Sequence, residues 1–418
     1  MGFAHDNIYI NKKGIQMKRN MIKLAAGAAA VLLMSTSAQA GYTMKKKVGD
    51  VDTKLTFFGF AQLEAVGGDG MKIKNKVDPD ETNSDIGFRA QRIRLGWKYV
   101  AGNVRGKVFL DFNQDHDNDD ATPANGAAMP KMIKDAFISY VVDPAFVVKA
   151  GLIKMPHGMS FTMPGWNLDI AERGLDKSLV LERNTGLMIS GRGIGYEGNK
   201  VDGFEMGHER PWKGFGYDIM IANQASRSGA VKADGASAFG GNSYAVRGMF
   251  DWTETLHLEA SYAISENADG ENKSLTNGED YTSMNIGVDS NLGALSLKAE
   301  YMTGNSIFGE KDYDETAITA TAGYFVTPSL ELVGKHLQGS SERLGVSTDL
   351  GNTYLGFNYF LSSPKQDFSR KSKRGRNQHK VVFNYIVASG DTDGATNEWN
   401  GQGGYKDDAF IAQYQFKF

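Results

Sequence analysis

The last stretch of the chain, Asp408-Ala409-Phe410-Ile411-Ala412-Gln413-Tyr414-Gln415-Phe416-Lys417-Phe418, decides the fold class. Successive side chains of a strand point to opposite faces, so a strand here has one apolar, largely aromatic face and one more polar face. The run is about ten residues long, whereas strands of soluble proteins average about five or six. Such a strand is typical of a transmembrane β-barrel, which turns an apolar band to lipid and a polar face to its lumen. The apolar face carries Phe410, Ala412, Tyr414, Phe416 and Phe418.

The same alternation recurs along the chain, for example in Leu256–Ile264, Leu295–Met302 and Lys380–Val387. An even number of such runs is expected, because a barrel must return its C-terminus to the side where it began. We therefore predict an all-β, transmembrane antiparallel β-barrel of sixteen strands. The predicted strands start near residues 54, 85, 103, 131, 145, 185, 214, 242, 255, 280, 294, 314, 329, 352, 379 and 408.

The joins between these runs alternate in length, which is an independent indication of a barrel in the outer membrane. Short turns on one side and long loops on the other predict short periplasmic turns and long extracellular loops. A soluble propeller would need a motif repeated every 40–50 residues, and the chain carries none. The short joins lie at Ala101-Gly102, Asp143-Pro144, Thr253-Glu254, Leu292-Gly293 and Thr327-Pro328, and the long ones at 67–84, 114–130, 154–184, 224–241, 266–279, 305–313, 338–351 and 389–407.

The N-terminus has the features of an export signal. A basic segment, Met17–Lys23, precedes the apolar run Leu24–Met34, and Ser35–Ala40 ends in the small-residue pattern that signal peptidase accepts. We expect residues 1–40 to be a signal peptide cleaved after Ala40, with 1–16 a spurious upstream extension; an uncleaved anchor helix is the alternative. Residues 41–53 would then form a short periplasmic N-terminal segment, and 54–418 a single barrel.

Composition excludes several other classes of function. The chain has no Cys, which excludes disulfides, thiolate metal sites and a cysteine nucleophile, and its net charge of −3 does not favour nucleic acid. Gly193–Gly198 matches a dinucleotide-binding pattern but no helix is expected after it, and Asp115–Asp120 lacks the glycine of a calcium loop. We expect no enzymatic activity, no metal and no cofactor.

The third long join, Lys154–Asn184, is too long for a simple connection and is expected to be functional. A sixteen-stranded barrel otherwise encloses a wide aqueous hole. We predict that this loop folds inward as a constriction loop, with a short helical stretch near 167–174.

Around this loop the chain resembles the phosphate-selective porin O and P family, a family of Gram-negative outer-membrane porins. The resemblance implies a sixteen-stranded barrel, a homotrimer, an inward-folded third loop and passive uptake of anions such as phosphate. It covers roughly residues 85–200 and is carried by Phe88–Gly96, Asp135–Tyr140, Lys149–Gly158, Glu172–Leu175 and Arg183–Gly186.

If the apolar faces meet lipid, the other faces line water and present many cations to it. The strands near 85, 103 and 145 carry acids only at Asp85 and Asp111, near their predicted outer ends, so the middle and periplasmic half of this wall is expected to be basic without local neutralisation. The far wall is mixed, with Arg247 among several acids. The predicted lumenal cations are Arg92, Arg94, Lys98, Arg105, Lys107, Lys149 and Arg247, and the constriction loop adds Lys154, His157, Arg173, Lys177 and Arg183.

These residues predict a passive outer-membrane diffusion channel for small hydrophilic solutes, weakly selective for anions. The expected partners are outer-membrane lipid and lipopolysaccharide, together with small anions as permeating solutes. A different interpretation is that the inward cations pair with acids and brace the barrel. A non-selective general porin, an outer-membrane enzyme and an adhesive or structural barrel remain alternatives.

Overall fold

The computed structural model describes residues 42–68, 86–113, 132–195, 213–224, 241–253, 255–266, 278–343, 345–361, 377–390, 404–405 and 407–418. The predicted signal peptide and most of the long loops lie outside the described residues. Among the residues described, no helix is long and apolar enough to span a membrane.

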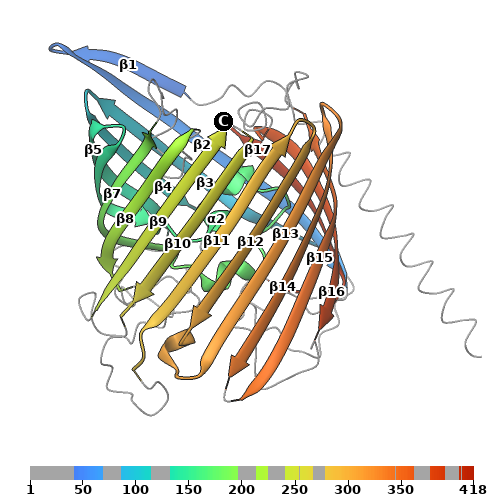
Figure 1. Cartoon of the computed structure of the whole chain (residues 1–418). Coiled ribbons are helices and arrows are strands. Elements are labelled where there is room, and N and C mark those ends of the chain that lie inside the picture. The colour runs from blue at the N-terminus through green and yellow to red at the C-terminus, as the bar shows by residue number, and fades with distance from the viewer. Residues whose placement is uncertain are drawn as a thin grey trace, which may run out of the picture.

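Sixteen antiparallel strands, β2 to β17, close into a barrel (Figure 1). Each pairs with its neighbours in the chain, and β17 pairs with β2 to complete the ring. Closure satisfies every strand edge, which the hydrocarbon of a bilayer requires. The strands are β2 (Val51–Gly68), β3 (Gly87–Ala101), β4 (Val104–Asp111), β5 (Ile133–Asp143), β6 (Phe146–Lys154), β7 (Arg183–Ile194), β8 (Gly214–Asn223), β9 (Asn242–Thr253), β10 (Leu256–Ser265), β11 (Tyr281–Leu292), β12 (Leu295–Asn305), β13 (Tyr313–Thr327), β14 (Leu330–Arg343), β15 (Val346–Phe360), β16 (His379–Gly390) and β17 (Ala409–Lys417).

The predicted long join 338–351 is wrong. β14 and β15 stay paired from Leu330↔Tyr359 to Arg343↔Val346, leaving only residues 344 and 345 between them. Gly345 adopts a φ of +76°, which a tight turn needs and glycine allows. The segment is polar on both faces and therefore resembles a loop in sequence, but it extends the two strands beyond the apolar part of the barrel.

The predicted N-terminal segment contains a strand of its own. β1 (Tyr42–Val48) pairs with β2 from Tyr42↔Phe57 to Val48↔Val51. β17 pairs with β2 only as far as Lys417↔Phe60, so β1 occupies the edge of β2 that β17 leaves free. The resulting hairpin extends beyond the rim of the barrel at the end where the C-terminus lies (Figure 1).

Side chains alternate between the outside and the inside of the barrel as the sequence predicts. In β10, Leu258 and Tyr262 are each 43% exposed, whereas His257, Glu259 and Ser261 are buried. The outward residues are the apolar set, and they form the surface that meets lipid. The inward residues are buried because another segment covers them.

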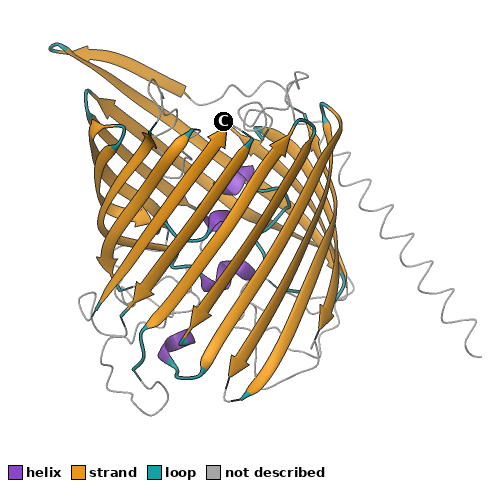
Figure 2. Cartoon of the chain, viewed as in Figure 1, coloured by secondary structure: helices purple, strands orange, loops and turns teal. Residues whose placement is uncertain are grey.

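That segment is the third long join, which lies inside the barrel (Figure 2). It contains helix α2 (Met159–Thr162) and two 3-10 turns, η2 (Gly165–Asn167) and η3 (Leu175–Leu179), so the helical stretch predicted near 167–174 is displaced to either side. We call residues 155–182 the inner loop.

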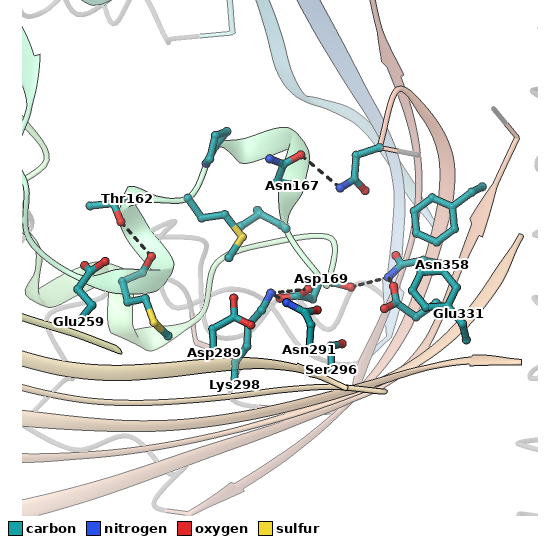
Figure 3. A pocket seen from close by; sticks show the side chains of 17 residues that line it. Thr162, Asn167, Asp169, Glu259, Asp289, Asn291, Ser296, Lys298, Glu331 and Asn358 are labelled. Carbon is teal, nitrogen blue, oxygen red and sulfur yellow. Dashed lines mark hydrogen bonds and ion pairs between the residues drawn. The ribbon is translucent and has the colours of Figure 1, made fainter. Parts of the chain in front are cut away.

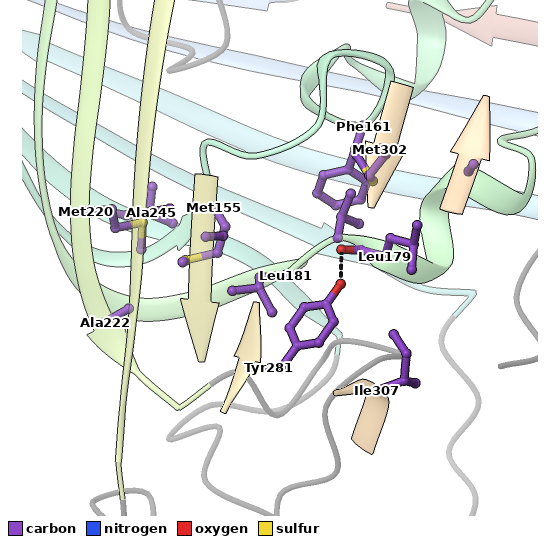
Figure 4. Close-up of a cluster of buried hydrophobic side chains, with 14 of the residues drawn as sticks. Met155, Phe161, Leu179, Leu181, Met220, Ala222, Ala245, Tyr281, Met302 and Ile307 are labelled. Carbon is purple, nitrogen blue, oxygen red and sulfur yellow. Dashed lines mark hydrogen bonds between the residues drawn. The ribbon is translucent and has the colours of Figure 1, made fainter. Parts of the chain in front are cut away.

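Three apolar clusters hold the inner loop in place. Met155, Phe161, Leu179 and Leu181 pack against inward residues of β5 to β15 (Figure 4). Ile170 and Ala171 pack against β14 to β17, and Trp166 against three phenylalanines of β2 and β4. Each fully buried large apolar side chain contributes roughly 1.5–3 kcal/mol. The inward wall residues of the second cluster are Val333, Leu337, Tyr354, Val382, Ile386, Ala409 and Ile411.

The orientation of β10 and β11 can be tested with one substitution on each face. We expect Leu258→Arg, on the lipid side, to lower the free energy of unfolding by about 2–4 kcal/mol, because it places a cation in hydrocarbon. Asn291→Arg, whose side chain lines a lumenal cavity, should cost much less. Unfolding by guanidinium chloride of protein folded into lipid vesicles measures both; a costlier Asn291→Arg would contradict the orientation.

Candidate functional site

Polar side chains of the wall hold the backbone of the inner loop. The Gln415 side chain donates to the carbonyl of Trp166 at 3.0 Å, and Lys380 donates to that of Leu168 at 2.7 Å. Carbonyl groups of an irregular segment need such donors, since they have no partner in a helix or a strand ladder. Further donors are Asn358 to Asp169, Gln413 to Ala171 and Gln62 to Gly165. The loop is therefore a fixed part of the lumen.

All the predicted lumenal cations face the interior, but they differ in access to water. Arg94, Lys98, Arg105, Arg173 and Lys177 are partly exposed. The other predicted residues are buried between the wall and the inner loop: Arg92, Lys107, Lys149, Lys154, His157, Arg183 and Arg247.

The prediction that the wall formed by β3, β4 and β6 lacks local neutralisation is wrong. Arg94 pairs with Asp111 at 2.8 Å, and Lys107 and Arg183 both pair with Asp135, the latter at 3.0 Å. Asp135 belongs to β5, a strand omitted from the sequence estimate. Ion pairs between neighbouring strands depend on register, which alternation within one strand does not determine.

Arg89 is a lumenal cation that the sequence analysis missed. The β2–β3 register shifts between Gln62↔Arg92 and Leu63↔Ala90, so Gln91 is an extra, bulged residue. The bulge turns Arg89 inward, where it pairs with Glu64 at 3.0 Å and contacts Glu172 of the inner loop. Strict alternation from Arg92 would place it in lipid, and no local pattern signals the bulge.

Arg192 is a second lumenal cation absent from the prediction, although it falls on the inward face of β7. It pairs with Asp218 at 3.0 Å, and Arg247 also bonds to Asp218, through Nε, at 2.8 Å. Arg247 approaches Glu259 at 3.6 Å as well. These buried pairs are the bracing that the alternative interpretation of the lumenal cations predicts.

Several cations gather at the C-terminal end of α2. Lys154 and Arg173 both donate to the carbonyl of Phe161, and Arg173 also donates to that of Met163. The Lys154 ammonium lies 4.2 Å from the centre of the Phe161 ring. Cations are favoured where the carbonyls of a helix end point outward. Two of the predicted cations, Lys154 and Arg173, thus lie at the same turn of the inner loop.

His157 is held as a neutral imidazole. The Ser283 hydroxyl donates to the carbonyl of Thr303 at 2.6 Å, so Nε2 of His157 donates to Ser283 Oγ at 2.7 Å. Nδ1 then accepts from Ser261, 3.1 Å away, whose oxygen accepts the Gly158 N–H. Burial lowers the pKa of His157 to about 4. The residue anchors the loop and does not supply a cation at neutral pH.

The open space of the lumen lies beside the mixed wall. A cavity with about 850 Å³ of space between atoms separates the inner loop from β10 to β15 (Figure 3). Its lining includes Glu259, Asp289, Glu331 and Lys298. Among the described side chains, no group of three or more His, Asp or Glu residues is arranged to hold a metal ion.

The model of the family described as phosphate-selective porin O and P matches residues 68–343. The chain belongs to this family. No curated protein sequence matches it significantly. It is therefore a porin of the outer membrane of Gram-negative bacteria, a channel protein rather than an enzyme.

Solved porin structures share the fold of this porin. OmpF of Salmonella typhi, in complex with daunomycin, matches with a TM-score of 0.58 at 13% identity, over 90% of this chain and 100% of that one. An anion-selective porin from Comamonas acidovorans matches with 0.53 at 14%, over 88% and 100%. OmpT of Vibrio cholerae, in trimer form, matches with 0.53 at 12%, over 88% and 99%. At these identities the likeness concerns the fold alone.

The neutral state of His157 predicts a pH dependence. An unfolded histidine has a pKa of about 6.5, so between that value and about 4 the unfolded chain binds the extra proton. The free energy of unfolding should therefore fall as the pH drops through this window and stay constant above it. His157→Gln, which stays neutral, should flatten this dependence. Guanidinium unfolding between pH 4 and 7.5 measures it, and parallel profiles for both proteins would refute the assignment.

Proposed function

We propose that this porin is a passive diffusion channel for small hydrophilic solutes with a weak preference for anions, phosphate among them. The observation that supports the preference most directly is a band of cations on the inner face of β3 to β6. Lys98 of β3 lies directly opposite Lys107 of β4, and Arg105 lies opposite Ser139, which in turn faces Lys149.

Such a band is costly to the fold. Like charges opposite each other on neighbouring strands destabilise a sheet. The low dielectric of the barrel wall also strengthens the electric field that these cations produce in the lumen. Lys107 is neutralised by Asp135, whereas Arg105 bonds to the carbonyls of Gly102 and Val104 and keeps its full charge. The partly exposed members, Lys98 and Arg105, are the ones that a passing anion can approach.

Two features keep the preference weak. Several of the buried cations form ion pairs, and the cavity beside the inner loop carries acids on the far wall. At physiological salt the field fades over about 8 Å. The acidic lining favours the second candidate, a general porin without ionic preference.

The proposal extends to the assembled protein. We propose that the chain is exported by residues 1–40, loses them after Ala40, and forms a homotrimer among outer-membrane lipid and lipopolysaccharide. The exposed apolar outer face, with Leu258, Ile286 and Leu355, supports contact with lipid or with neighbouring protomers.

Reversal potentials of purified protein in a planar bilayer, under a KCl gradient, test the selectivity. We expect wild-type protein to be anion-selective, and Lys98→Gln/Arg105→Gln to shift the permeability ratio toward unity, because the exposed part of the band is removed. Lys46→Gln, which neutralises an exposed lysine of the β1 hairpin, is the matched control. Cation selectivity of the wild type would end the proposal.

The preference for phosphate has its own test. If phosphate binds in the lumen, adding it to a chloride solution should reduce chloride conductance in a saturable way, because the two anions compete for the same path. The double variant Lys98→Gln/Arg105→Gln should be blocked less. Conductance that only follows the bulk conductivity of the mixture would indicate a general porin instead.

A further inference from the structure

Among the described residues, two ion pairs join the inner loop to the far wall: Lys298 with Asp169, and Lys335 with Asp176 at the longer distance of 3.8 Å. Lys298 of β12 donates to both carboxylate oxygens of Asp169, at 2.8 and 2.7 Å (Figure 3). The side chains keep 16% and 27% of their surface accessible to solvent. Unlike the buried pair of Arg192 with Asp218, this pair lines open space.

The pair lies between two cavities. The larger has about 850 Å³ of space and the smaller about 450 Å³, and both are lined by Lys298 and Asp169. On β12 the larger cavity reaches Ser296 and the smaller reaches Glu300, so Lys298 is the inward residue between them. The cavities are therefore stacked along the strands.

The neighbouring strands repeat this order. On β14 the larger cavity is lined by Glu331 and the smaller by Lys335, and on β13 Phe325 lines the larger and Thr319 the smaller. A solute that moves along the barrel by this route leaves one cavity and enters the other at the level of the pair. The other residues shared by both linings are Met159, Met163 and Leu168.

The carboxylate of Asp169 can leave Lys298 while the loop stays docked. Asn358 holds the carbonyl of Asp169 at 2.9 Å, and Lys380 holds that of Leu168 at 2.7 Å. The backbone at Leu168 and Asp169 is thus fixed on β15 and β16, while the Asp169 side chain extends to Lys298 on β12. A partly exposed ion pair contributes less to stability than its contact distance suggests, because solvent screens it, so it can open and close thermally.

We infer that the Lys298–Asp169 pair is the barrier between the two halves of this water path, and that it limits both the conductance and the charge preference of the channel. The inference rests on the proposed channel function and names the residues that restrict the flow of solute through the channel. Because one partner is a cation and the other an anion, removing either opens the path and changes its net charge in opposite directions.

Single-channel recording of three variants in planar bilayers tests this inference. Asp169→Asn and Lys298→Met should both raise the conductance, by roughly twofold if this path dominates, and shift the charge preference in opposite directions. Asp169→Asn removes a negative charge from the path and should favour anions, whereas Lys298→Met removes a positive charge and should favour cations. The charge swap Asp169→Lys/Lys298→Asp re-forms the pair and should return both quantities toward wild-type values.

Arg343→Gln is the matched control, since it breaks a partly exposed pair of 2.6 Å with Glu310, and neither residue lines the two cavities. Its conductance should equal that of the wild type. Unchanged conductance in Asp169→Asn and Lys298→Met, or selectivity shifts of the same sign, would overturn the inference while leaving the channel function intact. Absence of any ion current from wild-type protein would instead refute the proposed function.

A modification made after folding separates the barrier from any effect on assembly. The chain has no Cys, so Lys298→Cys places a single thiol in the lumen. In the planar bilayer, 2-aminoethyl methanethiosulfonate reacts with this thiol to form a disulfide that carries an ammonium group, and methanesulfinate leaves. The modified side chain therefore has the positive charge that Lys298 has in the wild type. We expect the conductance to fall toward the wild-type level. If mass spectrometry verifies complete labelling and the conductance does not fall, the proposed barrier is contradicted.

Discussion

The structure depends on the pairing of β17 with β2. In hydrocarbon every backbone N–H and C=O must find a partner within the protein, and this last ladder, from Ala409↔Gly68 to Lys417↔Phe60, supplies the partners that an open sheet would lack. Phe418 and Gly59 complete it by exchanging two backbone hydrogen bonds of 3.0 and 3.1 Å. The closed ring has sixteen strands. A barrel of that many strands has a lumen too wide for the side chains of the wall to fill.

The inner loop fills that lumen by two different interactions. Apolar side chains of the loop bury inward apolar residues of the wall, such as Leu337 and Ile386, and wall donors such as Gln415 satisfy the loop carbonyls. The loop packs tightly against the basic wall but leaves space beside β10 to β15. The packing of one loop thus decides which residues of each wall stay accessible to a permeating solute.

The charged residues of the lumen fall into two groups, one that stabilises the barrel and one that we propose acts on the permeating solute. Buried pairs such as Arg192–Asp218 neutralise charges that would otherwise be costly inside the barrel. Partly exposed groups, among them Lys98, Arg105 and Lys298, retain interactions with water and ions. The proposed anion preference and the proposed barrier both use this second group, and so they depend on which cations the loop covers.

The sequence alone determined the barrel, its strand order and its lipid-facing residues, because a bilayer accepts only one arrangement of alternating apolar and polar side chains. It also contained a signal that was not used: apolar residues on inward faces, such as Val382 and Ile411, indicate where the inner loop docks. Only the tertiary structure decided the bulge that turns Arg89 inward, the pairing of Lys107 with Asp135, the extension of β14 and β15, and the position of Asp169 against Lys298. Each of these depends on contacts between residues far apart in the chain, and such contacts leave no periodic pattern in the sequence.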